Sequence, residues 1–456
     1  MSEPRGERRR TKRWSDALAW AALVLILGGA LGRASVAADP MPYWDADPLL
    51  TPSVRTGLGP SVRTLLDALA MLGAACALGS ATLAGRGIQA RWVALLGVGG
   101  VWVALHGFVT PTDPMGTGRG DLEDLLIGGR WLGALGGAIG LAHLRGRVRR
   151  LGLGVCLGFV VMLAAKGMMQ QNVEHPLTML DYEAQREQIL AARGWRVDSP
   201  QALAYERRLR QNDASGWFGM PNVYATFGGI GLVAGTCLAI GGVRRKQTGA
   251  ALAAGLGAVC GGAMLVMSHS KGGAGASAIG LGIGMLVGSG WAGNRWRAWL
   301  LAGAPAVVLL LVVARGLVGE RIGELSLLFR WHYAQGSARM ILEHPLLGVG
   351  PGGFRDAYLL TRPPIGVEEV ASPHNVLLEW VATLGLGGLA WCGAGLGLIL
   401  RAGRDGPIEE APTNEREDVL LVAFLAGGVT VASALIEQAM ATPEGALARI
   451  LGLGLW

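Results

Sequence analysis

The chain has 456 residues, of which 51% are hydrophobic and only 16% charged, and its mean hydropathy is +0.40. Long apolar runs recur along the whole chain, which excludes an ordinary soluble domain and predicts a membrane protein. The net charge of +7 comes from basic residues confined to short segments without interleaved aromatic residues, so we expect no nucleic-acid partner.

Each apolar run of roughly 20 residues predicts one membrane-spanning helix, because lipid offers no hydrogen-bond partner to a backbone amide. The fold class expected is therefore all-α: a polytopic membrane helix bundle of about 11 to 12 transmembrane helices, with two long outer loops that contain interfacial helices. The expected spans are 16–37, 64–84, 92–109, 125–144, 151–168, 222–242, 248–267, 273–291, 298–316, 375–400 and 419–437. Residues 445–456 are apolar but too short, so the chain either ends in a partial twelfth span or was cut there.

Basic residues fall in every second loop, which predicts that these loops and the N-terminus face the cytoplasm. The expected organisation is a cytoplasmic basic arm (1–15), N-terminal spans (16–168), an outer loop (169–221), central spans (222–316), a large outer loop with the catalytic residues (317–374) and C-terminal spans (375–456). The first span is interpreted as an uncleaved anchor. Five cysteines inside spans, and three histidines, are interpreted as structural: Cys76, Cys156, Cys237, Cys260, Cys392, His106, His143 and His175.

The first outer loop contains two predicted helices. One runs over 178–193 and ends at Gly194, and the second begins at Ser199-Pro200 and ends near Arg210. We favour a solvated cap for this mixed-charge hairpin, and direct contact with a substrate is the alternative.

The second outer loop is predicted to contain a helix over 325–343 that lies along the membrane surface. Its apolar stripe is Leu327, Trp331, Ala334, Ala338 and Ile341. Arg330 borders this stripe near Tyr333 and can turn inward, whereas His332, Arg339 and Glu343 are expected on the wet side.

A glycine-rich turn and a histidine precede the tenth span. Gly348, Gly350, Gly352 and Gly353 permit close approach of a ligand, which is only weak evidence for phosphate. Ser372 is the expected N-cap and Pro373 the first helical residue, so His374 should lie in the first turn, neutral and next to an anion site. Glu379 shares a helical face with Asn375 and should either pair with a cation or orient His374.

Several motifs in residues 216 to 400 resemble the bacterial O-antigen ligase and polymerase superfamily. They are His374-Asn375 followed by Gly385 and Gly388, the segment from Arg330-Trp331 through His344-Pro345 to Phe354, the Asn222 region, and Ser268 to Gly272. Lys271 stands where the family usually has arginine, and Met220 where it usually has asparagine.

The resemblance implies a metal-independent inverting glycosyltransferase without a cofactor, in the bacterial inner membrane, with its site on the periplasmic side. Its partners would be a polyprenyl-diphosphate-linked glycan donor, a lipid, glycan or protein acceptor, and membrane lipids. Lys271 and Arg330 would then hold the diphosphate and His374 would act on the acceptor. The expected orienting or substrate-binding residues are Asn375, Glu379, Tyr333, Asn222 and Ser270.

Other interpretations stay open. Lys271 could be a lysine whose charged end reaches the interface, and Arg330 could bind lipid headgroups. The alternative function is a multi-span solute transporter with Glu379, Asp67 and Lys166 along a path, and a lipid-binding scaffold is a third reading. The same motifs are expected for a ligase and for a polymerase, so both activities stay open.

Overall fold

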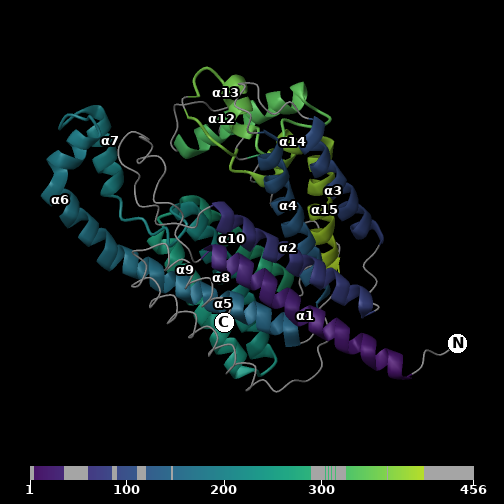
Figure 1. Cartoon of the computed structure of the whole chain (residues 1–456). Coiled ribbons are helices and arrows are strands. Elements are labelled where there is room, and N and C mark those ends of the chain that lie inside the picture. Colours follow the sequence, from purple (N-terminus) through teal and green to yellow (C-terminus); the bar gives the residue numbers. More distant parts are fainter. Residues whose placement is uncertain are drawn as a thin grey trace. The chain divides into compact units, whose positions relative to one another are not determined.

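The computed structural model describes residues 5–34, 60–84, 90–109, 120–144, 147–288, 325–366 and 368–404, with isolated positions at 303, 307, 310 and 314. All regular elements among these residues are helices, which confirms the expected helical membrane bundle (Figure 1). Four described segments are long and apolar enough to cross a membrane: Thr64–Leu83, Arg150–Ala192, Pro221–Arg244 and Thr248–Met267. The expected spans 419–437 and 445–456, and most of 298–316, lie outside the described residues.

Two compact units divide the described helices. One unit contains α3 (Ala90–Val109), α4 (Gly120–His143) and the helices from α12 onward, and the other contains α5 to α10. The helices α1 (Arg5–Ala34) and α2 (Pro60–Leu83) contribute residues to both.

In the second unit, an apolar helix continues directly into the segment predicted as the first outer loop. Helix α5 (Arg147–Met169) runs through a π-helical turn at Gln170–Glu174 into α6 (His175–Ala192). The prediction of a separate loop helix starting at 178 is therefore wrong. The wider turn directly precedes Pro176, whose missing N–H removes one helical hydrogen bond without ending the helix.

The remaining boundaries of this helical hairpin follow the sequence signals. Gly194 adopts a φ of +68° just after α6, and the hydroxyl of Ser199 accepts a hydrogen bond from the backbone N–H of Ala202 at the start of α7 (Pro200–Leu209). The hairpin is held by Glu206, only 5% exposed, whose carboxylate accepts hydrogen bonds from Tyr182 and Arg186.

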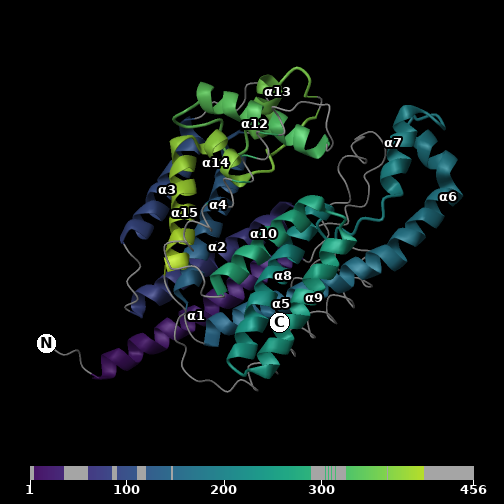
Figure 2. The same cartoon turned by 180° about the vertical axis from the view of Figure 1, so that it is seen from behind.

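The core of the second unit depends on close helix contacts. Helices α8 (Pro221–Arg244), α9 (Thr248–Met267) and α10 (Lys271–Gly288) lie side by side in both views (Figures 1 and 2). A Cβ atom on Gly261 of α9 would lie 2.5 Å from the carbonyl oxygen of Gly228 of α8. These two helices can therefore approach so closely only because both positions lack a side chain.

In the first unit, α12 (Leu325–Glu343) and the short α13 (Phe354–Thr361) pack together, and both contact α14 (Val376–Leu384). Helix α15 (Leu386–Arg404) follows α14. The expected continuous span over 375–400 is thus wrong, because Gly385 interrupts it with a φ of +56°. A Cβ atom on Gly388 would lie 1.8 Å from the carbonyl oxygen of Trp380, so the sharp bend requires glycine there.

Candidate functional site

His374 lies immediately before α14 instead of within its first turn. Asn375 is the N-cap, and its side-chain oxygen accepts hydrogen bonds from the backbone N–H groups of Leu377 (3.0 Å) and Leu378 (3.2 Å). The prediction that Ser372 caps the helix is therefore wrong. His374 adopts a φ of +52°, a left-handed conformation that is uncommon for histidine and marks a constrained position.

Ser372 links the backbone of His374 to a carboxylate. Its hydroxyl accepts a hydrogen bond from the backbone N–H of His374 (3.2 Å) and donates one to Glu379 Oε2 (3.1 Å). The carboxylate of Glu379 is therefore linked to the backbone of His374 through the Ser372 hydroxyl. These two hydrogen bonds fix the backbone that carries the imidazole.

Helix α12 supplies the side chains around the imidazole. The ring centroid of Tyr333 lies 5.6 Å from that of His374, and the Tyr333 hydroxyl donates a hydrogen bond to the carboxylate of Glu368. Partial burial lowers the pKa of His374, the positive charge of Arg330 lowers it further, and the negative charge of Glu368 opposes both. The arrangement favours a neutral imidazole that can accept a proton, although His374 keeps access to solvent.

The buried face of α12 differs from the predicted stripe. It includes Leu328, Tyr333, Ser337 and Met340, because α13 and α14 cover this side of the helix. His332, expected on the wet side, is only 3% exposed, so that prediction is wrong.

The other α12 positions agree better with the sequence. Arg339 and Glu343 are exposed as expected, and Arg339 donates a hydrogen bond to the carbonyl oxygen of Thr361. Arg330 is half-buried.

The glycine-rich turn packs against the bend between α14 and α15. The backbone N–H groups of Val349 and Gly350 donate to the carbonyl oxygens of Ala382 (3.0 Å) and Thr383 (2.9 Å). Gly348 adopts a φ of +73°, and a Cβ atom there would lie 2.4 Å from the carbonyl carbon of Thr383. These glycines therefore permit backbone contact within the protein.

Helix α4 holds the same turn from another side, and α3 holds the end of α14. The carboxylate of Asp124 accepts a hydrogen bond from the backbone N–H of Gly352 (2.5 Å), and Trp102 Nε1 donates to the carbonyl oxygen of Leu384 (2.9 Å). The glycine-rich turn and the end of α14 are thus each tied to another helix of this unit.

The second unit contains the other predicted cation. Lys271 is exposed and is the first residue of α10. The hydroxyl of the buried Ser270 accepts a hydrogen bond from Gly273 N and donates one to Asn222 Oδ1 over 2.8 Å. Asn222 and Ser270 therefore fix the turn that carries Lys271.

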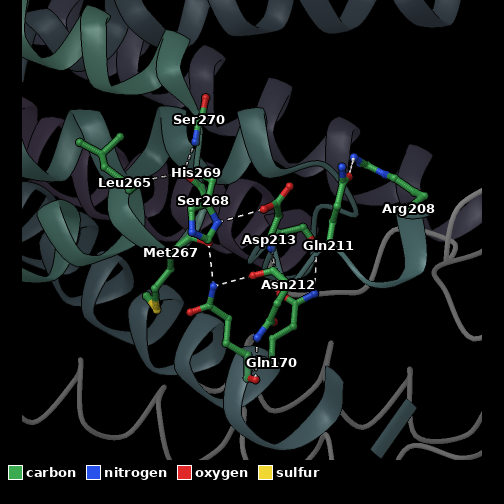
Figure 3. Close-up of polar contacts among 12 residues, drawn as sticks. Gln170, Arg208, Gln211, Asn212, Asp213, Leu265, Met267, Ser268, His269 and Ser270 are labelled. Atoms are coloured by element: carbon green, nitrogen blue, oxygen red, sulfur yellow. Dashed lines mark hydrogen bonds and ion pairs between the residues drawn. The ribbon is translucent and has the colours of Figure 1, made fainter. Parts of the chain in front are cut away.

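Figure 3 shows a network on the same turn that the sequence did not indicate. His269 Nδ1 lies 2.9 Å from Asp213 Oδ1, and Ala214 N donates to the carbonyl oxygen of Met267. The side-chain oxygen of Gln170 accepts from the backbone N–H groups of Ser215 and Gly216. The π-helical turn after α5 thereby contacts the loop before α8.

The sequence-predicted residues fall into two groups. Arg330, Tyr333, His374, Asn375 and Glu379 belong to the first unit, where the first three are neighbours and the last two order the start of α14. Lys271, Asn222 and Ser270 belong to the second unit, so a joint diphosphate site stays a prediction. Sequence reasoning missed Glu368, which lies in an irregular segment without a motif.

Comparison with known proteins adds one finding. Residues 256–392 match the family model described as O-antigen ligase, and this range contains Lys271, Arg330 and His374. The resemblance to the O-antigen ligase and polymerase superfamily is thus confirmed over this segment, which supports a glycan ligase or polymerase in general. No curated protein and no solved structure matches the chain.

Proposed function

We propose that this chain, with its O-antigen ligase segment at 256–392, transfers a glycan from a polyprenyl-diphosphate carrier to an acceptor hydroxyl. The observation that carries the proposal is His374 itself. It is constrained before a helix, its pKa is lowered, and it has Arg330 and Tyr333 as neighbours. A neutral imidazole with access to solvent suits general-base catalysis near neutral pH.

In the proposed reaction, His374 accepts the proton of the acceptor hydroxyl while the hydroxyl oxygen forms a bond to the anomeric carbon. The bond from that carbon to the diphosphate oxygen breaks, and its electron pair leaves with the lipid diphosphate. Attack from the face opposite the leaving group inverts the anomeric configuration. Arg330 and Lys271 would stabilise the departing diphosphate by their positive charge.

The supporting residues have roles that follow from their contacts. Asn375 orders the start of α14, and Glu379 acts on the His374 backbone through Ser372. Asn222 and Ser270 hold the turn of Lys271. We place the protein in the bacterial inner membrane with the site on its outer side, because the basic loops are expected in the cytoplasm.

Transport is the alternative function, since a helix broken in the membrane is a feature of many transporters. Here, however, the backbone groups at the break are occupied by the chain itself. Leu386 N donates to the carbonyl oxygen of Leu346, and Ala382 and Thr383 accept from the glycine-rich turn. In addition, Lys166 is engaged by Glu174 at 2.6 Å. We therefore favour the enzyme.

The test is a deletion of the gene in its native host, complemented with His374→Ala. We expect glycan transfer to fall by about 10²- to 10⁴-fold at an unchanged protein level, as for loss of a general base. His344→Ala is the matched control, because His344 is exposed and lies outside the His374 cluster. Normal transfer by the His374 variant would disprove the mechanism.

The deletion strain also distinguishes ligase activity from polymerase activity. Long glycan chains that accumulate on the lipid carrier would identify a ligase, whereas single repeat units would identify a polymerase. Loss of uptake of a solute in the deletion strain, without any glycan defect, would favour transport instead.

A further inference from the structure

We propose that Glu368, held by Tyr333, is a positioning residue that stabilises the protonated form of His374 during glycan transfer. The inference rests on the proposed function of His374 as a general base. Glu368 lies outside the sequence motifs described above, so the proposal adds a carboxylate to the candidate site.

Tyr333 is itself fixed. Its side chain is 5% exposed, and its ring meets that of Tyr358 edge-on at a centroid distance of 5.9 Å. Tyr358 is in turn stacked on Phe354 from the same short helix, α13. The phenol that donates to Glu368 therefore projects from a buried aromatic cluster, so its direction is set by packing.

The segment around Glu368 is also held in place. Arg362 donates a hydrogen bond to the backbone carbonyl oxygen of Glu368 (3.3 Å). The next residue, Glu369, instead pairs with Arg355 of α13. Two adjacent carboxylates thus have different partners, and only Glu368 is joined to the ring that packs against His374.

Charged groups of opposite sign surround His374. The charged and titratable groups around His374 are Arg330 and Tyr333 on α12, Glu368 in the preceding loop, and Glu379, which reaches it through Ser372, while Arg362 contacts Glu368. The positive charge of Arg330 opposes protonation of the imidazole and the negative charge of Glu368 favours it.

This balance has a role in the reaction. Arg330 must lie close to hold a diphosphate, yet its charge makes His374 a weaker base. Glu368 offsets that effect when His374 takes the acceptor proton, because the new imidazolium forms near a carboxylate. The proton stays on His374, and Glu368 contributes only its charge and its hold on Tyr333.

The test uses Glu368→Gln, which removes the charge and keeps an oxygen that can accept from Tyr333. Histidine-labelled full-length protein in detergent micelles is titrated by NMR, and the His374 signal is identified by its loss in His374→Gln. We expect the His374 midpoint to fall by roughly half a pH unit, which is the size of a Coulomb interaction across several ångströms of well-solvated protein. Transfer in the complemented deletion strain should fall about threefold.

Two further variants complete the design. Glu369→Gln is the matched control and should leave both the midpoint and the transfer rate unchanged, since Glu369 pairs with Arg355. Glu368→Asp keeps the charge and should return the midpoint toward that of the wild type. This rescue would not occur if residue 368 were needed only for folding.

The outcomes are separable from those of the proposed function. An unchanged His374 midpoint in Glu368→Gln overturns this inference, even where transfer falls, because the loss would then be structural. Full transfer by His374→Ala overturns the proposed function itself. The titration of His374 in Glu368→Gln would then describe a histidine without a catalytic role.

Discussion

His106 Nε2 lies 2.6 Å from the backbone carbonyl oxygen of Leu347, across 241 residues of sequence. The imidazole is fully buried, and its Nδ1 lies 2.8 Å from the carbonyl oxygen of Trp102 one turn earlier in α3. His106 thereby ties α3 to the turn that supports α14. A histidine without a motif around it is thus a structural link near the candidate site.

Replacement of His106 by alanine should destabilise the protein by about 1 to 3 kcal/mol, because the partly buried carbonyl of Leu347 loses its hydrogen-bond partner. The measurement is thermal unfolding of the purified protein in detergent. His344→Ala, on the exposed part of the same outer segment, should leave the unfolding midpoint unchanged. Equal midpoints for both variants would refute the link.

Alanine should destabilise the protein at the two motif glycines, Gly385 and Gly388, and not at a neighbouring glycine on α15. Gly388→Ala places a methyl group against the carbonyl of Trp380, and Gly385→Ala combines a similar clash with a left-handed backbone. We expect both variants to accumulate poorly and unfold at lower temperature. Gly393→Ala is the control, since no atom of the described residues outside the local helix backbone lies within 4 Å of the added carbon, and it should behave as the wild type.

Asn375 should contribute to stability as a helix cap. Asn375→Ala removes the acceptor for Leu377 and Leu378 and should cost about 0.5 to 2 kcal/mol. Asn375→Asp and Asn375→Ser keep a capping oxygen and should retain the wild-type unfolding midpoint. If Asn375→Asp is stable but transfers no glycan, the amide itself contacts the substrate. Loss of stability in all three variants would contradict a simple capping role.

Lys271 should tolerate arginine and not alanine. Lys271→Ala is expected to lower transfer at least about tenfold at limiting donor, the size of one lost charge-assisted contact. Lys271→Arg should restore or exceed the wild-type rate, because guanidinium binds phosphate with two parallel hydrogen bonds. The control is Lys12→Ala, an exposed lysine near the N-terminus. Wild-type transfer by Lys271→Ala would place Lys271 outside the donor site.

The pH dependence of transfer should follow His374. A general base works only when it is unprotonated, so activity is lost as the pH falls through the pKa of His374. Because burial and Arg330 lower that pKa, the acid limb should lie below the ordinary histidine value of 6.5. The measurement is the rate of transfer from a saturating lipid-linked donor across a pH series. An acid limb above 6.5 would contradict the assignment.

Local sequence signals predicted much of the helical framework. Ser199-Pro200 begins a helix as expected, and apolar runs correspond to the long helices, because hydropathy and capping act over a few residues. The break at Gly385 was not predicted. An apolar run looks the same whether its helix is straight or bent, and the bend depends on the turn around Gly348 that packs against it.

The candidate site divides in the same way. The sequence by itself singled out His374, Arg330 and Lys271 as candidates, since their motifs are short and local. Only the tertiary structure moved His374 out of the helix, gave the capping role to Asn375, buried His332 and brought Glu368 to Tyr333. These outcomes depend on which faces α12, α13 and α14 turn to one another, and residues distant in sequence settle that by packing.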